Sequence, residues 1–204
     1  MSMLSWAVTA FKHTRVTLVI GMSNQPYRKA QTGGWSSHMV NALRTEEGSW
    51  IKSGTGKWVY QASTTKHVHD GSTTIERIRQ TATRAATFRA GNCGEHASVA
   101  FIYLVDNARC DPRFLISRMT LTDGDHGFLV LNRDISKDGT KPAEWGDGAI
   151  ILDVWGRFVC THAQLMSAAG VAELVDIDTD NVALVQNYIK HHNAKVLCER
   201  MSPA

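Results

Sequence analysis

Residues 93–107 are the segment that most constrains the fold of this 204-residue chain. Apolar side chains occupy nearly every side of a helix over this range: Ala97, Val99, Ala100, Phe101, Ile102, Leu104 and Val105. A helix that is apolar all round is buried inside its domain. Asn92 is a suitable N-cap, and Glu95, three residues later, completes a capping-box pattern in which Asn replaces the usual Ser or Thr. The sequence therefore predicts a buried helix that begins at Cys93.

Both helices and strands are expected around this central segment. A helix is predicted from Thr73 or Thr74 to about Ala90, and its apolar face carries Ile75, Ile78, Ala82, Ala85 and Ala86. Strands are predicted at 114–119, 126–132 and 149–154, with a turn at 122–125 and a polar loop at 136–148. Further helices are predicted at 161–169, ended by Gly170, and at 182–191. This mixture of elements predicts an α+β fold.

The first 72 residues have the least regular pattern. Val16–Ile20 is β-branched enough to predict a strand, and short strands are predicted at 50–51 and 58–60. Gly, Ser, Thr, Asn and Gln dominate the rest of 23–72, which favours irregular structure or long hairpins. The pattern changes at residue 73. We therefore expect residues 1–72 to form an extension or subdomain packed on a core made by residues 73–204.

Composition excludes several classes of protein. The formal net charge of +3 is too small and too dispersed to indicate nucleic-acid binding. No stretch is apolar for long enough to span a membrane. The apolar run at 4–22 is interrupted by Lys12, His13 and Arg15, and it lacks the features of a secretory signal peptide. The composition is typical of a soluble globular protein.

The cysteine and histidine spacings favour neither a disulfide framework nor a metal site. The four cysteines are Cys93, Cys110, Cys160 and Cys198, and none belongs to a C-x-x-C pair. Such spacing indicates reduced thiols, although Cys160 and Cys198 could still pair in space. A zinc site at Cys93, His96 and His126 is disfavoured, because no second ligand pair has metal spacing. His67, His69, His191 and His192 are expected at the surface. We expect no metal and no cofactor.

Three side chains, in order along the chain, predict nucleophilic catalysis. Cys93 opens a helix, where the unpaired amides and the macrodipole favour a thiolate. His126 starts a strand that would hold it rigidly, and Asp153 ends another apolar strand, where an ionised carboxylate needs a partner. Each residue alone has a common structural explanation. Together they have the order of a nucleophile, its base and the group that orients the base.

Neighbouring residues complete the predicted site. Asn92 and the backbone N–H of Cys93 are candidate oxyanion donors, and Gly94 removes bulk beside the sulfur so that a substrate backbone can approach. Trp145 and Trp155 are near enough to the triad segments to line a cleft. His96 is disfavoured as the base because it lies on the same helix as the nucleophile. It is expected under or beside the site, or bonded to a backbone carbonyl.

These segments resemble the papain-like and transglutaminase-like superfamily of cysteine enzymes. Residues 91–97 (GNCGEHA) are similar to the cysteine motif, residues 125–128 (DHGF) to the histidine motif, and residues 151–155 (ILDVW) to the aspartate motif. Val154 departs from the proline that often follows that aspartate. The resemblance covers residues 73–160. It implies a central buried helix carrying Cys93, packed on an antiparallel sheet that carries His126 and Asp153.

The nearest branch of the superfamily is that of bacterial effectors and toxins. The resemblance implies hydrolysis or acyl transfer at a protein amide through a thioester, with glutamine deamidation of a host or target protein favoured. Cysteine protease, transglutaminase and cell-wall peptide amidase remain as alternatives, as does a catalytically silent binding domain of the same fold. It also implies delivery by a specialised secretion system to a target-cell cytoplasm.

Overall fold

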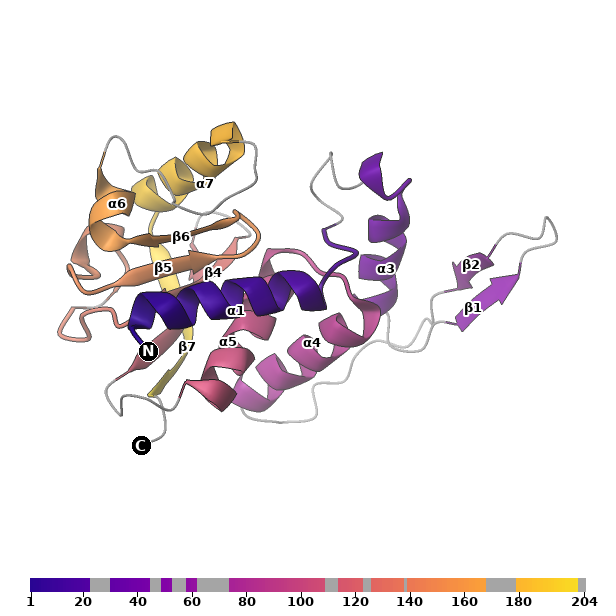
Figure 1. The fold of residues 1–204 in the computed structure, drawn as a ribbon, viewed down its shortest axis with the longest axis horizontal. Coiled ribbons are helices and arrows are strands. Elements are labelled where there is room, and N and C mark those ends of the chain that lie inside the picture. The colour runs from indigo at the N-terminus through magenta and orange to yellow at the C-terminus, as the bar shows by residue number, and fades with distance from the viewer. Residues whose placement is uncertain are drawn as a thin grey trace.

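A five-stranded antiparallel sheet forms the centre of the computed structural model, which describes residues 1–22, 30–44, 49–52, 58–61, 74–108, 114–122, 126–137, 139–167 and 179–201 (Figure 1). The strand order is β6-β5-β4-β3-β7. The strands are β3 (Leu115–Leu121), β4 (Gly127–Leu131), β5 (Ile150–Asp153), β6 (Phe158–Thr161) and β7 (Ala194–Met201). Every neighbouring pair is antiparallel. Together with the helices, this sheet confirms the α+β class.

Helices cover both faces of the sheet, and side chains at alternate strand positions divide between two cores. One face packs against α1 (Met3–Thr17) and α5 (Cys93–Asn107). Its strand residues are Ile116, Leu129, Leu131, Ile150, Leu152 and Val159. The other face packs against α6 (His162–Met166) and α7 (Thr179–His191). Its strand residues include Met119, Phe128, Val130, Ile151 and Phe158.

The helix that carries Cys93 is enclosed on several sides. α5 packs against the sheet, against α1 and against α4 (Thr74–Phe88). On its outer side, Val99 meets Ala82 and Ala85 of α4. Arg79 of α4 also makes two hydrogen bonds to Asp106, at 2.6 and 2.7 Å, and so joins the two helices at the surface. The predicted buried helix therefore forms at its predicted bounds.

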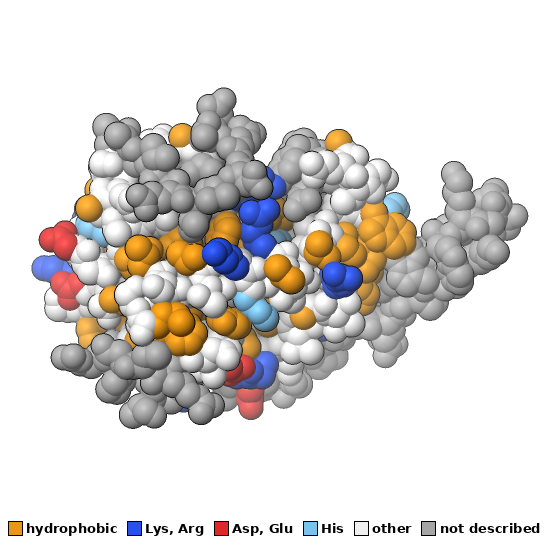
Figure 2. Space-filling model, in the orientation of Figure 1, with side chains coloured by type: hydrophobic (Ala, Val, Ile, Leu, Met, Phe, Trp, Pro, Cys, Tyr) orange, Lys and Arg blue, Asp and Glu red, His pale blue; other side chains and the backbone are white. Residues whose placement is uncertain are grey.

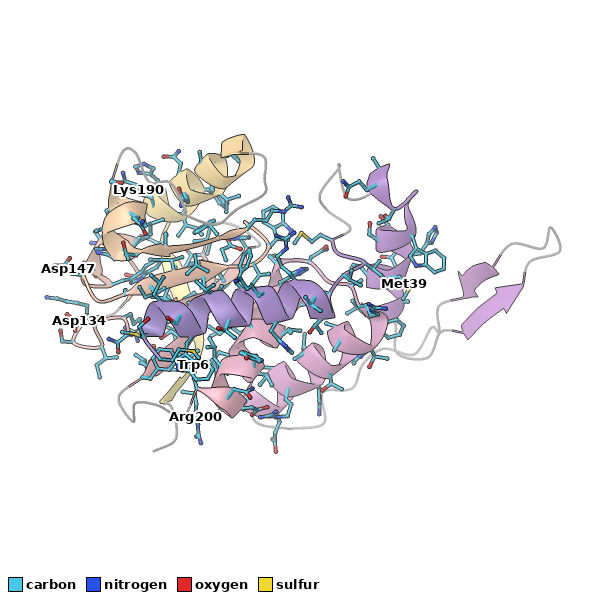
Figure 3. The ribbon with its side chains drawn as sticks, viewed as in Figure 1. Trp6, Met39, Asp134, Asp147, Lys190 and Arg200 are labelled. Atoms are coloured by element: carbon cyan, nitrogen blue, oxygen red, sulfur yellow. The ribbon has the colours of Figure 1, made fainter. Side chains whose placement is uncertain are left out.

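The remaining described elements lie outside the sheet. α3 (Trp35–Arg44) packs against α4. β1 (Ser49–Lys52) and β2 (Trp58–Gln61) pair as an antiparallel hairpin, which confirms the two short strands predicted there. The loop before β5 contains a 3-10 turn, η1 (Pro142–Glu144). Lys190 on α7 donates to the carbonyl oxygen of Met166 at 2.8 Å and links the end of α7 to α6 (Figure 3).

The structure corrects two expectations about secondary structure and adds two strands. The strand predicted at Val16–Ile20 is wrong, because α1 runs to Thr17 and a turn follows. Ala7, Ala10 and Phe11 bury one face of α1, and this packing outweighs the strand preference of a few β-branched residues at its end. The helix predicted at 161–169 begins at His162 after the N-cap Thr161, while Gly170 lies outside the described residues. β6 and β7 were not predicted.

Hydrophobic side chains at the surface do not form one continuous area on the face that α1 covers. Figure 2 shows those of the described residues in several patches, separated by other side chains, by backbone and by a few basic side chains. On α1 and α3, the exposed large hydrophobic side chains are Leu4, Val16 and Trp35. Isolated exposures of this kind are ordinary for a folded protein.

Candidate active site

Cys93 is the first residue of α5, and local hydrogen bonds fix the chain on both sides of it. The Glu95 carboxylate accepts from the backbone N–H of Asn92 at 2.8 Å, which is the Glu95 half of the expected capping box. The Nδ1–H of His96 donates to the carbonyl oxygen of Asn92 at 2.9 Å. Only 6% of the Cys93 surface is exposed. The sulfur is therefore held at a defined helix end with limited access.

His126 and Asp153 meet across two neighbouring strands. His126 directly precedes β4 and Asp153 ends β5, and in an antiparallel pair the start of one strand lies beside the end of the next. The Nε2 of His126 lies 2.6 Å from Oδ2 of Asp153. The other carboxylate oxygen, Oδ1, accepts from the backbone N–H of Gly156 at 2.7 Å. Asp153 is fully buried, so these two bonds hold the carboxylate and the ring in one orientation.

The start of α5 and the start of β4 are in close contact. A β-carbon added to Gly127 would lie 3.4 Å from the Cα of Gly94 and 3.7 Å from the carbonyl carbon of Cys93. This approach brings the imidazole of His126 within hydrogen-bonding range of Cys93. Because Nε2 is bonded to Asp153, Nδ1 is the ring nitrogen that remains for the sulfur. The structure thus brings the three predicted residues together as a connected group.

The charges in this group favour a protonated His126. Burial alone would lower the pKa of His126, but the charge and hydrogen bond of Asp153 outweigh it, and Cys93 adds to the effect, raising the pKa to about 10. His126 is therefore an imidazolium near neutral pH. A neighbouring cation is one of the surroundings in which cysteines of proteins are reactive.

The other predicted site residues divide into those beside the group and those apart from it. The Trp155 ring makes an edge contact with the His126 ring, with 5.2 Å between ring centroids. His96 is buried, which lowers its pKa to about 4 and keeps it neutral, as suits its bond to a backbone carbonyl. Trp145 has no exposed surface and packs among the core side chains of the α7 face, with its Nε1–H donating to Gly139. The expectation that Trp145 lines a cleft is therefore corrected.

Two residues near the site were missed in the sequence. Arg118 on β3 donates from Nη2 to the carbonyl oxygen of Gly94 at 3.3 Å. Gly156 supplies the N–H that binds Asp153. Neither belongs to a motif, and each reaches the site only through strand pairing or a tight turn. A single charged residue inside an apolar strand was the only available signal for Arg118.

None of the cysteines that the structure describes forms a disulfide. Cys160 is buried and Cys198 is half-buried, and both are free thiols, as is Cys93. Burial raises the pKa of Cys160 to about 12. Within the described ranges, no group of three or more His, Cys, Asp or Glu side chains is placed to hold a metal ion. Cys110, His67 and His69 lie outside those ranges.

Comparison with known proteins adds no family assignment. No protein-family model, curated protein or solved structure matches the chain. Among the described helices, none combines the length and the apolar character needed to cross a membrane.

Proposed function

We propose that this protein is a cysteine-dependent amide hydrolase or acyltransferase acting on a protein substrate, with Cys93, His126 and Asp153 as its catalytic triad. The observation that carries the proposal is the 2.6 Å bond between His126 Nε2 and Asp153 Oδ2, in a ring whose other side contacts Cys93. A nucleophile, a base and an orienting carboxylate from three separate segments have converged. This convergence supports a papain-like or transglutaminase-like core.

The proposed reaction has two halves, in which a thioester forms on Cys93 and is then hydrolysed. The Cys93 thiolate attacks the amide carbonyl carbon, and the backbone N–H of Cys93, assisted by the side chain of Asn92, holds the oxyanion. The C–N bond breaks as His126 gives its proton to the leaving nitrogen, and a thioester remains on Cys93. A water then loses a proton to His126 and attacks the thioester. The carboxylate product leaves, and the thiolate and imidazolium are restored.

Among the possible reactions we favour deamidation, with glutamine side chains of a protein as the substrate. This choice rests on the resemblance of the three motifs to those of bacterial effectors. The same resemblance supports a soluble effector delivered to the cytoplasm of a target cell. The triad chemistry is common to deamidase, transglutaminase, protease and cell-wall amidase. These activities differ in which amide enters and which nucleophile resolves the thioester.

Intact-mass analysis of a protein mixture after incubation tests the proposal. Deamidation adds about one dalton with release of ammonia, crosslinking loses about seventeen, and proteolysis breaks a chain, following from the acceptor of the common thioester. Digestion of purified peptidoglycan tests the cell-wall alternative. Cys93→Ser is the inactive control. Activity that survives this substitution refutes the proposal, and a Cys93 that iodoacetamide labels no faster than Cys160 favours a silent binding domain.

A further inference from the structure

Arg118 occupies a position that the sheet would otherwise give to an apolar residue. It lies at the middle of β3, with Leu129 of β4 as one register partner and Cys198 of β7 as the other. Ile116, two positions earlier on the same face of the strand, and Leu129 both belong to the core beneath α5. Successive side chains alternate between the faces of a sheet, so Arg118 also points toward α5. A cation here interrupts an apolar surface.

Arg118 is half-buried and has few hydrogen-bond partners among the described residues. Its Nη2 makes one hydrogen bond to Gly94, at 3.3 Å, and its buried Nε has no partner among the described residues. Burial lowers the pKa of Arg118, against the nearby Cys198, Cys93 and Glu95, which favour its charge. Withdrawing part of a half-buried cation from water with so few bonds costs free energy that an apolar residue of similar size would not. A leucine at position 118 could join β3 to α5 at a lower cost in free energy.

The groups around Arg118 indicate what the charge does. Its guanidinium contacts the first turn of α5, one residue after the sulfur-bearing position, and it interacts electrostatically with Cys93. His126 approaches Cys93 from β4, while Arg118 approaches the same helix end from β3. A permanent cation in a poorly solvated place stabilises a neighbouring anion far more than it would in water.

We propose that Arg118 is a positioning residue that holds a permanent positive charge beside the sulfur of Cys93 and thereby favours its thiolate. The inference rests on the proposed function, because it presupposes that Cys93 reacts as an anion. Arg118 differs from His126 in that it transfers no proton. Its charge persists through both halves of the reaction, including the step in which His126 has given up its proton.

The test is the pH dependence of Cys93 alkylation by iodoacetamide, followed by mass spectrometry of the Cys93 peptide. Arg118→Met removes the charge, Arg118→Lys keeps it, and Arg118→Gln keeps a donor for the Gly94 carbonyl without charge. We expect the midpoint of alkylation to rise by about one pH unit in the Met and Gln variants, which is about a tenfold loss of rate below the midpoint. The Lys variant should retain most of the wild-type behaviour.

Arg133→Met is the matched control. Arg133 is a buried arginine that pairs with Glu199 at 2.6 Å. Its loss should lower stability and leave the Cys93 midpoint unchanged. An unchanged midpoint in Arg118→Met, or a midpoint restored in Arg118→Gln, would overturn the inference while leaving the triad intact. If wild-type Cys93 is no more reactive than Cys160, the proposed function itself fails. Should the Met variant not fold, the comparison of Gln with Lys decides the question.

Discussion

Gly156 lies so close to Asp153 that a β-carbon at position 156 would be 2.7 Å from Oδ2 of the carboxylate. The same β-carbon would be 2.8 Å from a methyl carbon of Val185 on α7. Real β-carbons do not approach other atoms this closely, so any side chain at 156 must displace its neighbours. The oxygen in question is the one that contacts His126. Position 156 therefore affects the orientation of the proposed triad without belonging to it.

Gly156→Ala should reduce activity strongly although all three triad residues remain. The added methyl group pushes the Asp153 carboxylate away from His126 or moves α7, and the lost orientation of the base should cost about 100-fold or more in kcat/KM. Turnover on an identified substrate, or the rate of Cys93 alkylation at neutral pH, measures the effect. Gly148→Ala is a control, because its β-carbon would meet only Nδ2 of Asn132, at an ordinary 3.7 Å. Equal activity in Gly156→Ala and wild type would contradict this account.

The helix that carries Cys93 could be predicted closely because its signals are local. An N-cap, a first-turn glutamate and an all-round apolar composition lie within one short stretch, and α5 begins and ends where they indicate. β7 lacks such a signal, since Lys195, Glu199 and Arg200 interrupt its apolar residues and it follows α7 almost directly. β6 has four residues just after a turn, too short to show a period.

The candidate site also contains some residues that could be predicted from the sequence and others that could not. The grouping of Cys93, His126 and Asp153 could be predicted from residue type and order, because each stands at the end of a recognisable element. Arg118 and Gly156 could not, because their roles depend on which strand lies beside which and on the tightness of one turn. Trp145 was misplaced for a related reason. Nearness in sequence to the triad strands does not tell which face of the sheet a tryptophan covers.

Asp153→Asn should leave the fold intact but remove the carboxylate that favours the protonated form of His126. Without the carboxylate, burial dominates and the pKa of His126 falls below its present value of about 10. The thiolate–imidazolium pair is then less populated, and activity should fall by about 100- to 10,000-fold. The NMR titration of the His126 ring protons measures the pKa directly. A His126 that still titrates near its wild-type value would show that Asp153 is not what raises it.

The raised pKa of His126 also predicts how stability changes in alkaline solution. The folded protein binds this proton more tightly than the unfolded chain, whose histidine titrates near 6.5. The resulting stabilisation is fully present below 6.5 and is lost as the pH rises toward about 10. The free energy of unfolding by urea should therefore fall across this range. His126→Gln should remove this part of the fall, so the wild type and the variant should converge in stability as the pH rises.

His96 predicts the opposite dependence on the acidic side. Its burial lowers its pKa to about 4, so the folded state keeps it neutral at a pH where an unfolded chain would protonate it. The contribution that His96 makes to the free energy of unfolding is fully present above pH 6.5. It is lost as the pH falls toward about 4, by up to about 3 kcal/mol in total. His96→Asn places an amide donor near the position of Nδ1, where it can still reach the Asn92 carbonyl, and has no titrating ring. Urea unfolding at several pH values should show a shallower acid loss in this variant than in the wild type. His191→Asn, which removes an exposed histidine from the end of α7, should not alter that loss. If His96→Asn loses as much stability in acid as the wild type, His96 binds its proton equally well in the folded and unfolded states, and this account is wrong.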